Sequence, residues 1–105
     1  MTHAPHAAIG KRCIIRTYAS GVHLGTVVSA ESNEGRTRCE LADTRRIRYW
    51  NGATSLSEMS QKGLETARSQ VCDNVPQHFI EDVIEIIPAT DAAIATIEAA
   101  TNVAK

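Results

Sequence analysis

Short runs of alternating apolar and polar residues, separated by turn-forming residues, most constrain what this chain can fold into. The strand runs expected in the first half are residues 11–18, 23–30, 36–42 and 45–50. The turns expected between them are Ala19-Ser20-Gly21, Ser32-Asn33-Glu34-Gly35 and Asp43-Thr44. A two-residue period is typical of strands with one buried face, and Gly, Asn, Asp and Ser are typical of tight turns. The pattern predicts an antiparallel meander whose edges must be closed or covered.

Two helices are expected in the second half of the chain. Ser55 and Glu58 fit a capping box, which predicts a short helix over residues 56–62. Thr90 can cap a final helix that runs from residue 91 to about residue 102. This last helix is rich in alanine, so it leaves a smooth surface that can pack on its own sheet or on a neighbouring subunit.

One further strand is expected between the helices. Residues 79–87 have strand character, and the run 83–87 is the stronger part because it is apolar on both faces apart from Glu85. Val75-Pro76 interrupts any regular element, because proline disfavours a helical residue before it. The course of residues 64–78 stays open.

The length of 105 residues predicts one domain, with residues 1–10 as a flexible N-terminal arm and residues 11–105 as the folded part. Only four residues are Phe, Tyr or Trp, so the core must be aliphatic. We expect a small β-rich α+β domain, an antiparallel meander of about five strands that can close in a barrel-like way, with a short middle helix and a C-terminal helix. A homo-oligomer is expected, since a small core gains burial by assembly.

Charge is unevenly spread along the chain. Residues 11–50 carry eight basic and four acidic side chains, and residues 51–105 carry three basic and eight acidic ones. Three explanations are open: the halves pair within one fold, subunits pair head to tail, or the basic half holds a local anion site. A long nucleic acid is an unfavoured partner, because the acidic half would repel it and no helix has a basic face.

The three cysteines show no spacing typical of a metal site, and the sequence has no signal peptide or long apolar run. Cys13 and Cys39 alternate with polar residues, which indicates buried thiols in a reducing cytoplasm. We therefore expect no metal, no cofactor and no membrane contact.

The stretch from Arg45 to Asn51 is the strongest functional signal. Strict alternation places Arg46, Arg48 and Trp50 on one face of a strand. Guanidinium groups bind phosphate or carboxylate, and an indole stacks on flat rings. The alternative is a solvated outer sheet face, with Trp50 as a partly buried lid.

The full set of expected ligand-binding residues combines this stretch with polar and aromatic residues near the first turn. These residues are Arg16, Tyr18, Ser20, His23, Arg45, Arg46, Arg48, Trp50 and Asn51. No nucleophile stands in a recognisable elbow or beside a paired base, so an enzyme is not expected.

Several segments resemble a family of small proteins encoded by tailed phages and prophages. Residues 16–26 resemble the family's RTYSAGVHxGTL opening, and residues 42–53 resemble its A-x-ARR-x-W-x-W-x-GA segment. Residues 55–58 resemble its S-L-x-E, and residues 85–88 its EIIP. The chain departs from this pattern at Ala19-Ser20, where Ser-Ala is usual, and at Arg48-Tyr49, where Trp and a polar residue are usual.

The resemblance implies a phage source and a compact β-rich fold, but no defined activity. By analogy of size and surface chemistry, the chain is similar in kind to the sponges that phages use against the Thoeris defence. We therefore expect a non-enzymatic anti-defence protein in the bacterial cytoplasm that sequesters a cyclic or ADP-ribose-type nucleotide. The alternative is a structural or nucleic-acid-associated phage accessory protein without a small ligand.

Overall fold

The computed structural model describes residues 6–102, which form one antiparallel sheet and two α-helices. In chain order the elements are β1 (Arg12–Thr17), β2 (Val22–Asn33), β3 (Arg36–Tyr49), α1 (Leu56–Lys62), the 3-10 helix η1 (Thr66–Arg68), β4 (Gln70–Val71), β5 (Val75–Ile80), β6 (Val83–Pro88) and α2 (Asp91–Glu98). The expected small β-rich α+β fold with a middle and a C-terminal helix is confirmed.

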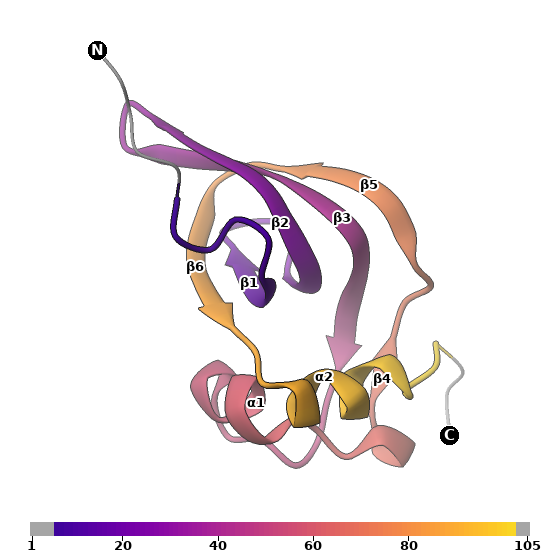
Figure 1. Cartoon of the computed structure of the whole chain (residues 1–105). Coiled ribbons are helices and arrows are strands. Elements are labelled where there is room, and N and C mark those ends of the chain that lie inside the picture. The colour runs from indigo at the N-terminus through magenta and orange to yellow at the C-terminus, as the bar shows by residue number, and fades with distance from the viewer. Residues whose placement is uncertain (1–5, 103–105) are drawn as a thin grey trace.

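The sheet curls back on itself (Figure 1). Its order is β4-β3-β2-β1-β6, and β5 pairs with β3 beside β4. Residues 81–82 alone join β5 to β6, so the chain crosses directly from the β3 side of the sheet to the β1 side. The meander β1-β2-β3 predicted from the sequence is therefore present, and the last two strands close around it.

The prediction of a turn at Asp43-Thr44 is wrong, because β3 runs through these residues without a break. Asp43 has a φ of 51°, and the pairing of β3 with β2 shifts register between Leu24 and Thr26. A bulge of this kind contains a residue with a positive φ, as many tight turns do. The same residue types, such as Asp, therefore indicate either structure. Gly25 sits opposite the bulge, where a Cβ would lie 2.6 Å from the Thr44 methyl group.

The single strand expected over residues 79–87 is in fact two strands. Asp82, with a φ of 52°, turns the chain between β5 and β6. Pro76 lies inside β5, although the sequence suggested that it would interrupt any regular element. β5 pairs only with β3 in the described chain, and proline is tolerated on such an edge strand because its missing N–H is not needed there.

Both expected helix starts are confirmed. Ser55 Oγ accepts a hydrogen bond from Glu58 N at the start of α1, and Thr90 Oγ1 accepts one from Ala93 N at the start of α2. α2 ends at Glu98, about one turn earlier than the sequence suggested. The two helices pack together beneath the curled sheet (Figure 1).

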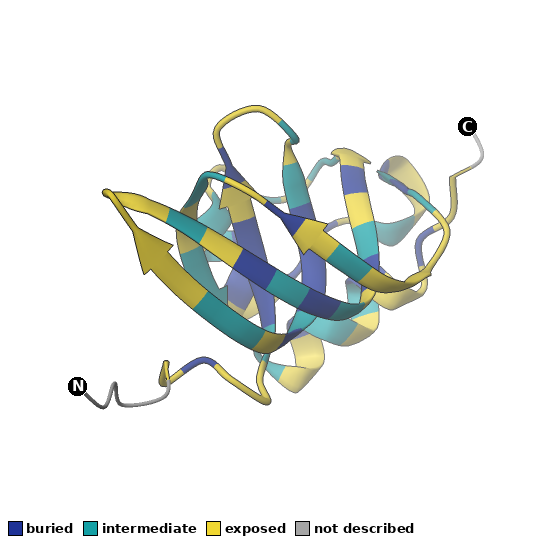
Figure 2. Cartoon of the chain, turned by 90° about the horizontal axis from the view of Figure 1, so that it is seen from above, coloured by how far each residue is buried: buried dark blue, intermediate teal, exposed yellow. Residues whose placement is uncertain are grey.

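Two apolar clusters fill the protein, one on each face of the sheet. The cluster next to the helices includes Ile14, Leu24, Ile47, Met59, Val71 and Ile97. The cluster inside the curl includes Cys13, Ile15, Val27, Cys39, Leu41 and Ile80. Ile14 and Ile15 therefore point to opposite faces of the sheet. Figure 2 shows the buried residues as dark blue bands that alternate with exposed ones along the strands. Burial raises the pKa of the Cys39 thiol to about 11, with a smaller contribution from Cys13, so Cys39 is a neutral thiol at pH 7.

The expected N-terminal arm lies partly outside the described residues. In its described part, Ala8 is buried in the inner cluster, and Gly10 N donates a hydrogen bond of 2.8 Å to Val27 O. Residues 7–10 form a turn that is fixed to β2 in this way.

Arg45 holds the end of α2 against the sheet. All five N–H groups of its guanidinium have a backbone carbonyl partner. The acceptors are the carbonyls of Cys72 (2.9 Å), Ile97 (3.3 Å), Glu98 (2.8 Å), Val71 (3.3 Å) and Ala100 (2.7 Å). The last turn of α2 contains no basic residue, so Arg45 supplies the positive charge and the donors that a helix C-terminus lacks.

We expect Arg45→Ala to destabilise the protein by at least about 3 kcal/mol, because several buried carbonyls lose a charged donor. Arg46→Ala is the matched control, since its exposed side chain makes none of these contacts, and it should change stability by less than about 0.5 kcal/mol. Arg45→Lys should fall between them, because an ammonium has only three donors. Urea unfolding of the three variants measures this. Equal losses in the free energy of unfolding for Arg45→Ala and Arg46→Ala would show that the carbonyl contacts of Arg45 do not stabilise the fold.

His23 is a fully buried histidine on β2. Its Nε2 lies 3.0 Å from Ser20 O, and a carbonyl only accepts, so Nε2 carries the proton. Its Nδ1 has no hydrogen-bond partner among the described residues, and the His78 ring packs edge-on at 5.3 Å. Burial, assisted by Arg46 and His78, lowers the pKa of His23 to about 4, so the ring is neutral at pH 7.

This buried histidine predicts a pH-dependent stability. The unfolded chain binds the His23 proton near pH 6.5 and the folded chain only near pH 4, so stability is full above about pH 6.5 and falls as the pH drops towards 4. The loss should reach about 3 kcal/mol. His23→Gln should flatten the dependence between pH 6.5 and 5, above most carboxylate titrations. Melting temperatures of the parent protein and of the His23→Gln variant are measured at several pH values. If both fall equally steeply between pH 6.5 and 5, His23 is not the responsible group.

Candidate functional site

The structure separates most of the predicted ligand-binding residues. Arg45 is directed into the fold, and its five donors are all used by backbone carbonyls. Trp50 is half-buried and packs against the cluster beside the helices, as the lid interpretation expected. His23 is buried, so its ring is not presented to a ligand.

Other predicted residues are exposed, or half-buried in the case of Ser20, but lie in different places. Arg16 faces Glu85 on β6, with 3.7 Å between Nε and Oε1. Ser20 Oγ shares a hydrogen bond of 2.8 Å with Thr17 Oγ1 in the turn after β1. Arg48 donates a hydrogen bond of 3.1 Å to Asn102 Oδ1. Two close pairings occur among the predicted residues: the exposed Arg46 is the strand partner of His23, and His23 Nε2 donates to Ser20 O.

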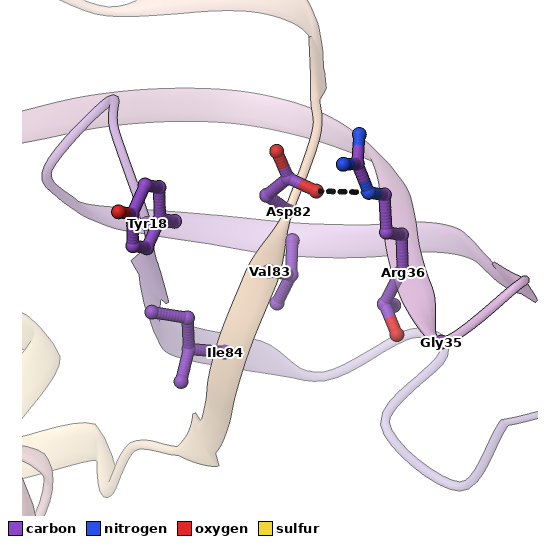
Figure 3. Close-up of a pocket in the computed structure, with 7 residues that line it drawn as sticks. Tyr18, Gly35, Arg36, Asp82, Val83 and Ile84 are labelled. Carbon is purple, nitrogen blue, oxygen red and sulfur yellow. Dashed lines mark ion pairs between the residues drawn. The ribbon is translucent and has the colours of Figure 1, made fainter.

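A concave surface lies beside Tyr18, and we call it the Tyr18 groove (Figure 3). It has a volume of about 580 Å³ and is lined by Tyr18, Gly35, Arg36, Thr37, Asp82, Val83 and Ile84. These residues come from the end of β1, the β2–β3 hairpin and the start of β6. Tyr18 is the only member of the predicted set that lines the groove.

Local backbone geometry holds the Tyr18 ring out of the core. Tyr18 N donates a hydrogen bond of 3.0 Å to Asp82 O, directly after β1 ends. The tyrosine side chain is 81% exposed, although a tyrosine in a small sheet commonly packs into the core. Ile84 sits at a register shift between β1 and β6 and is 50% exposed, so the groove has an apolar wall.

Arg36 forms the opposite side of the groove. The Glu34-Gly35 turn, with φ values of 54° and 78°, starts β3 and places Arg36 next to the β5–β6 corner. Arg36 Nε lies 3.7 Å from Asp82 Oδ1, as Figure 3 shows. Both side chains are exposed, and such a pair contributes at most about 1 kcal/mol. The guanidinium can therefore turn to an anionic ligand at little cost.

These groups form a set with distinct chemical tasks. A tyrosine face and an isoleucine can cover a flat ring, a guanidinium binds phosphate, and a carboxylate accepts hydrogen bonds from sugar hydroxyls. Sequence reasoning missed Arg36, Asp82 and Ile84. These residues were expected in strands and were given no binding role. No local sequence pattern shows that the tip of the β2–β3 hairpin lies beside β6.

A second hollow contains Asn51, another predicted residue. Its volume is about 310 Å³, and its lining residues are Tyr49, Asn51, Ala67, Arg68, Ser69 and Gln70. Asn51 Nδ2 already donates to Tyr49 Oη and to Arg68 O, each at 3.0 Å. Because the Asn51 donors bind within the protein, this hollow offers fewer available polar groups than the Tyr18 groove.

Within residues 6–102, no group of three metal-ligating side chains comes together. None of the helices in this range is both long enough and apolar enough to cross a membrane.

Comparison with known proteins gives one match. The family model of a domain of unknown function, DUF6948, matches residues 10–97, a range that contains all six strands and the Tyr18 groove. No curated protein matches the chain, and no solved structure does. Since the matched range covers most of the sequence, the chain belongs to the DUF6948 family.

Proposed function

We propose that this protein is a non-enzymatic binding protein that sequesters a small anionic nucleotide in the Tyr18 groove. The observation that carries the proposal is that Tyr18, which is 81% exposed, lines a concave surface of about 580 Å³ beside an apolar wall and opposite Arg36. An exposed aromatic ring costs hydration free energy that stacking on a ligand would recover. Arg36 would bind the phosphate and Asp82 the sugar hydroxyls.

Sequestration rather than catalysis fits the groups in the groove. Its polar lining side chains are a phenol, a guanidinium, a carboxylate and the Thr37 hydroxyl, and it contains no histidine or cysteine. The mechanism we propose is reversible capture in which the covalent bonds of the ligand stay intact. We further propose that this capture takes place in the cytoplasm of a bacterial host and blunts a nucleotide-based defence against a phage.

The distribution of charge favours a small ligand over a long nucleic acid. Four ion pairs join an arginine of the first half to an acid of the second: Arg12–Glu98, Arg16–Glu85, Arg36–Asp82 and Arg38–Glu81. The basic half is thus paired with the acidic half within one fold, as one of the three sequence explanations held. Acids beside these arginines would repel a continuous polyanion, whereas a single phosphate at Arg36 displaces one weak pair.

Substitutions in the groove should separate binding from stability. Arg36→Ala should weaken nucleotide binding by about one to two powers of ten, because a charge-assisted contact is lost. Tyr18→Ala should weaken it roughly tenfold through the lost stacking. Both side chains are exposed, so melting temperatures should stay near that of the parent. Calorimetric titration with a panel of mono-, di- and cyclic nucleotides measures the affinities.

Arg38→Ala is the matched control for this experiment. Arg38 lies on the same strand and pairs with Glu81, but it does not line the groove. Affinity lost to the same extent in the Arg38 variant would contradict a site in the groove. A parent protein that binds none of the nucleotides would favour a structural or nucleic-acid-associated role. Ligand recovered in a chemically altered form would indicate an enzyme.

We also propose that the protein is a homo-oligomer. One face of α2 is buried against its own sheet, while Ala92, Ala95 and Ala99 remain exposed as a smooth surface. Light scattering at micromolar concentration should report a mass well above the 11.4 kDa of one chain. Ala95→Arg should reduce that mass if this surface is the contact. A parent protein that scatters as a monomer would overturn the proposal.

A further inference from the structure

A second, smaller hollow, which we call the Glu85 hollow, lies beside the Tyr18 groove along β6. It has a volume of about 230 Å³ and is lined by His6, Thr37, Val83, Ile84, Glu85 and Ile86. Thr37, Val83 and Ile84 line both spaces. The two hollows are therefore neighbours between the start of β3 and β6, close enough for one extended ligand to contact both.

The polar groups of the Glu85 hollow differ from those near Tyr18. His6 Nδ1 accepts a hydrogen bond of 3.0 Å from Ala8 N, so the donor that the ring can offer to a ligand is Nε2–H. The Glu85 carboxylate is 45% exposed, and its only ion pair among residues 6–102 is the 3.7 Å contact with Arg16. A donor next to an acceptor suits the hydroxyl groups of a sugar. A carboxylate repels phosphate, so the phosphates belong nearer to Arg36.

We infer that the ligand is a nucleoside phosphate that carries a second sugar, and that Glu85 and His6 recognise the hydroxyls of that sugar. The base lies against Tyr18 and Ile84, the phosphates lie between Arg36 and Thr37, and the second sugar fills the Glu85 hollow. This inference rests on the proposed function. It distinguishes a nucleotide that carries a second sugar from one that has a single base and a single sugar.

The test compares matched ligands that differ only in the second sugar. Dissociation constants are measured by calorimetry for ADP and ADP-ribose, GDP and GDP-mannose, and UDP and UDP-glucose. The sugar-bearing member of at least one pair should bind roughly tenfold more tightly, as expected for one or two additional hydrogen bonds. Glu85→Ala should remove that difference and leave the affinity for the plain diphosphate within a factor of two, and His6→Ala should reduce the difference.

Arg16→Ala is the control for the broken ion pair. It removes the same pair but keeps the carboxylate, so the preference for the second sugar should persist. Equal affinities within every ligand pair, or a Glu85→Ala variant that weakens both members alike, would overturn the inference while nucleotide binding itself stands. A parent protein that binds none of the six ligands would overturn both the inference and the proposed function.

Discussion

The five carbonyl contacts of Arg45 are the interaction on which the arrangement of the second half depends. They join the middle of β3 to the segment at Val71 and Cys72 and to the end of α2. A guanidinium of this kind is rigid and planar, so it fixes the mutual position of the segments as well as their distance. With α2 held here, Ile97 and Ala100 stay in the apolar cluster beside the sheet.

The direction of Arg45 follows from the bulge at Asp43. Side chains alternate between the two faces of a strand. One additional residue at a bulge therefore moves every later side chain of the strand to the opposite face. Beyond the bulge, Arg45 is paired with Leu24 and lies on the side of the helices, together with Ile47. A left-handed aspartate thus determines that this arginine stabilises the fold and does not face a ligand.

The position of the groove also depends on irregular points in the backbone. β2 extends several residues beyond the end of its pairing with β1, and the hairpin that follows carries Arg36 to the corner between β5 and β6. Asp82 turns the chain at that corner, and the register shift at Ile84 leaves an isoleucine exposed. Each feature is local, but only their combination makes a concave surface next to Tyr18.

Local sequence signals predicted β1, β2, both helix caps and the burial of Cys13 and Cys39, because each depends on near neighbours. They could not separate the bulge at Asp43 from a turn, since both use the same residue types. Strict alternation does not hold beyond Ile47, because the pairing of β3 with β4 shifts register between Ile47 and Tyr49, and Trp50 packs in the same cluster as Ile47. Alternation also could not show that a helix would end over Arg45. Arg36 and Asp82 gave no signal, because their proximity arises only when the sheet curls.

We propose the Tyr18 groove as the ligand surface, whereas the five carbonyl contacts of Arg45 give that residue a structural role. Backbone amide shifts of the ¹⁵N-labelled protein, recorded while the tightest-binding nucleotide of the panel is added, distinguish the two surfaces. A nucleotide bound in the groove should cause the largest shift changes at residues 18, 35–37 and 82–85, with small changes at 45–51. Changes concentrated at 45–51 and 68–70, with residues 18 and 82–85 unaffected, would contradict the proposal.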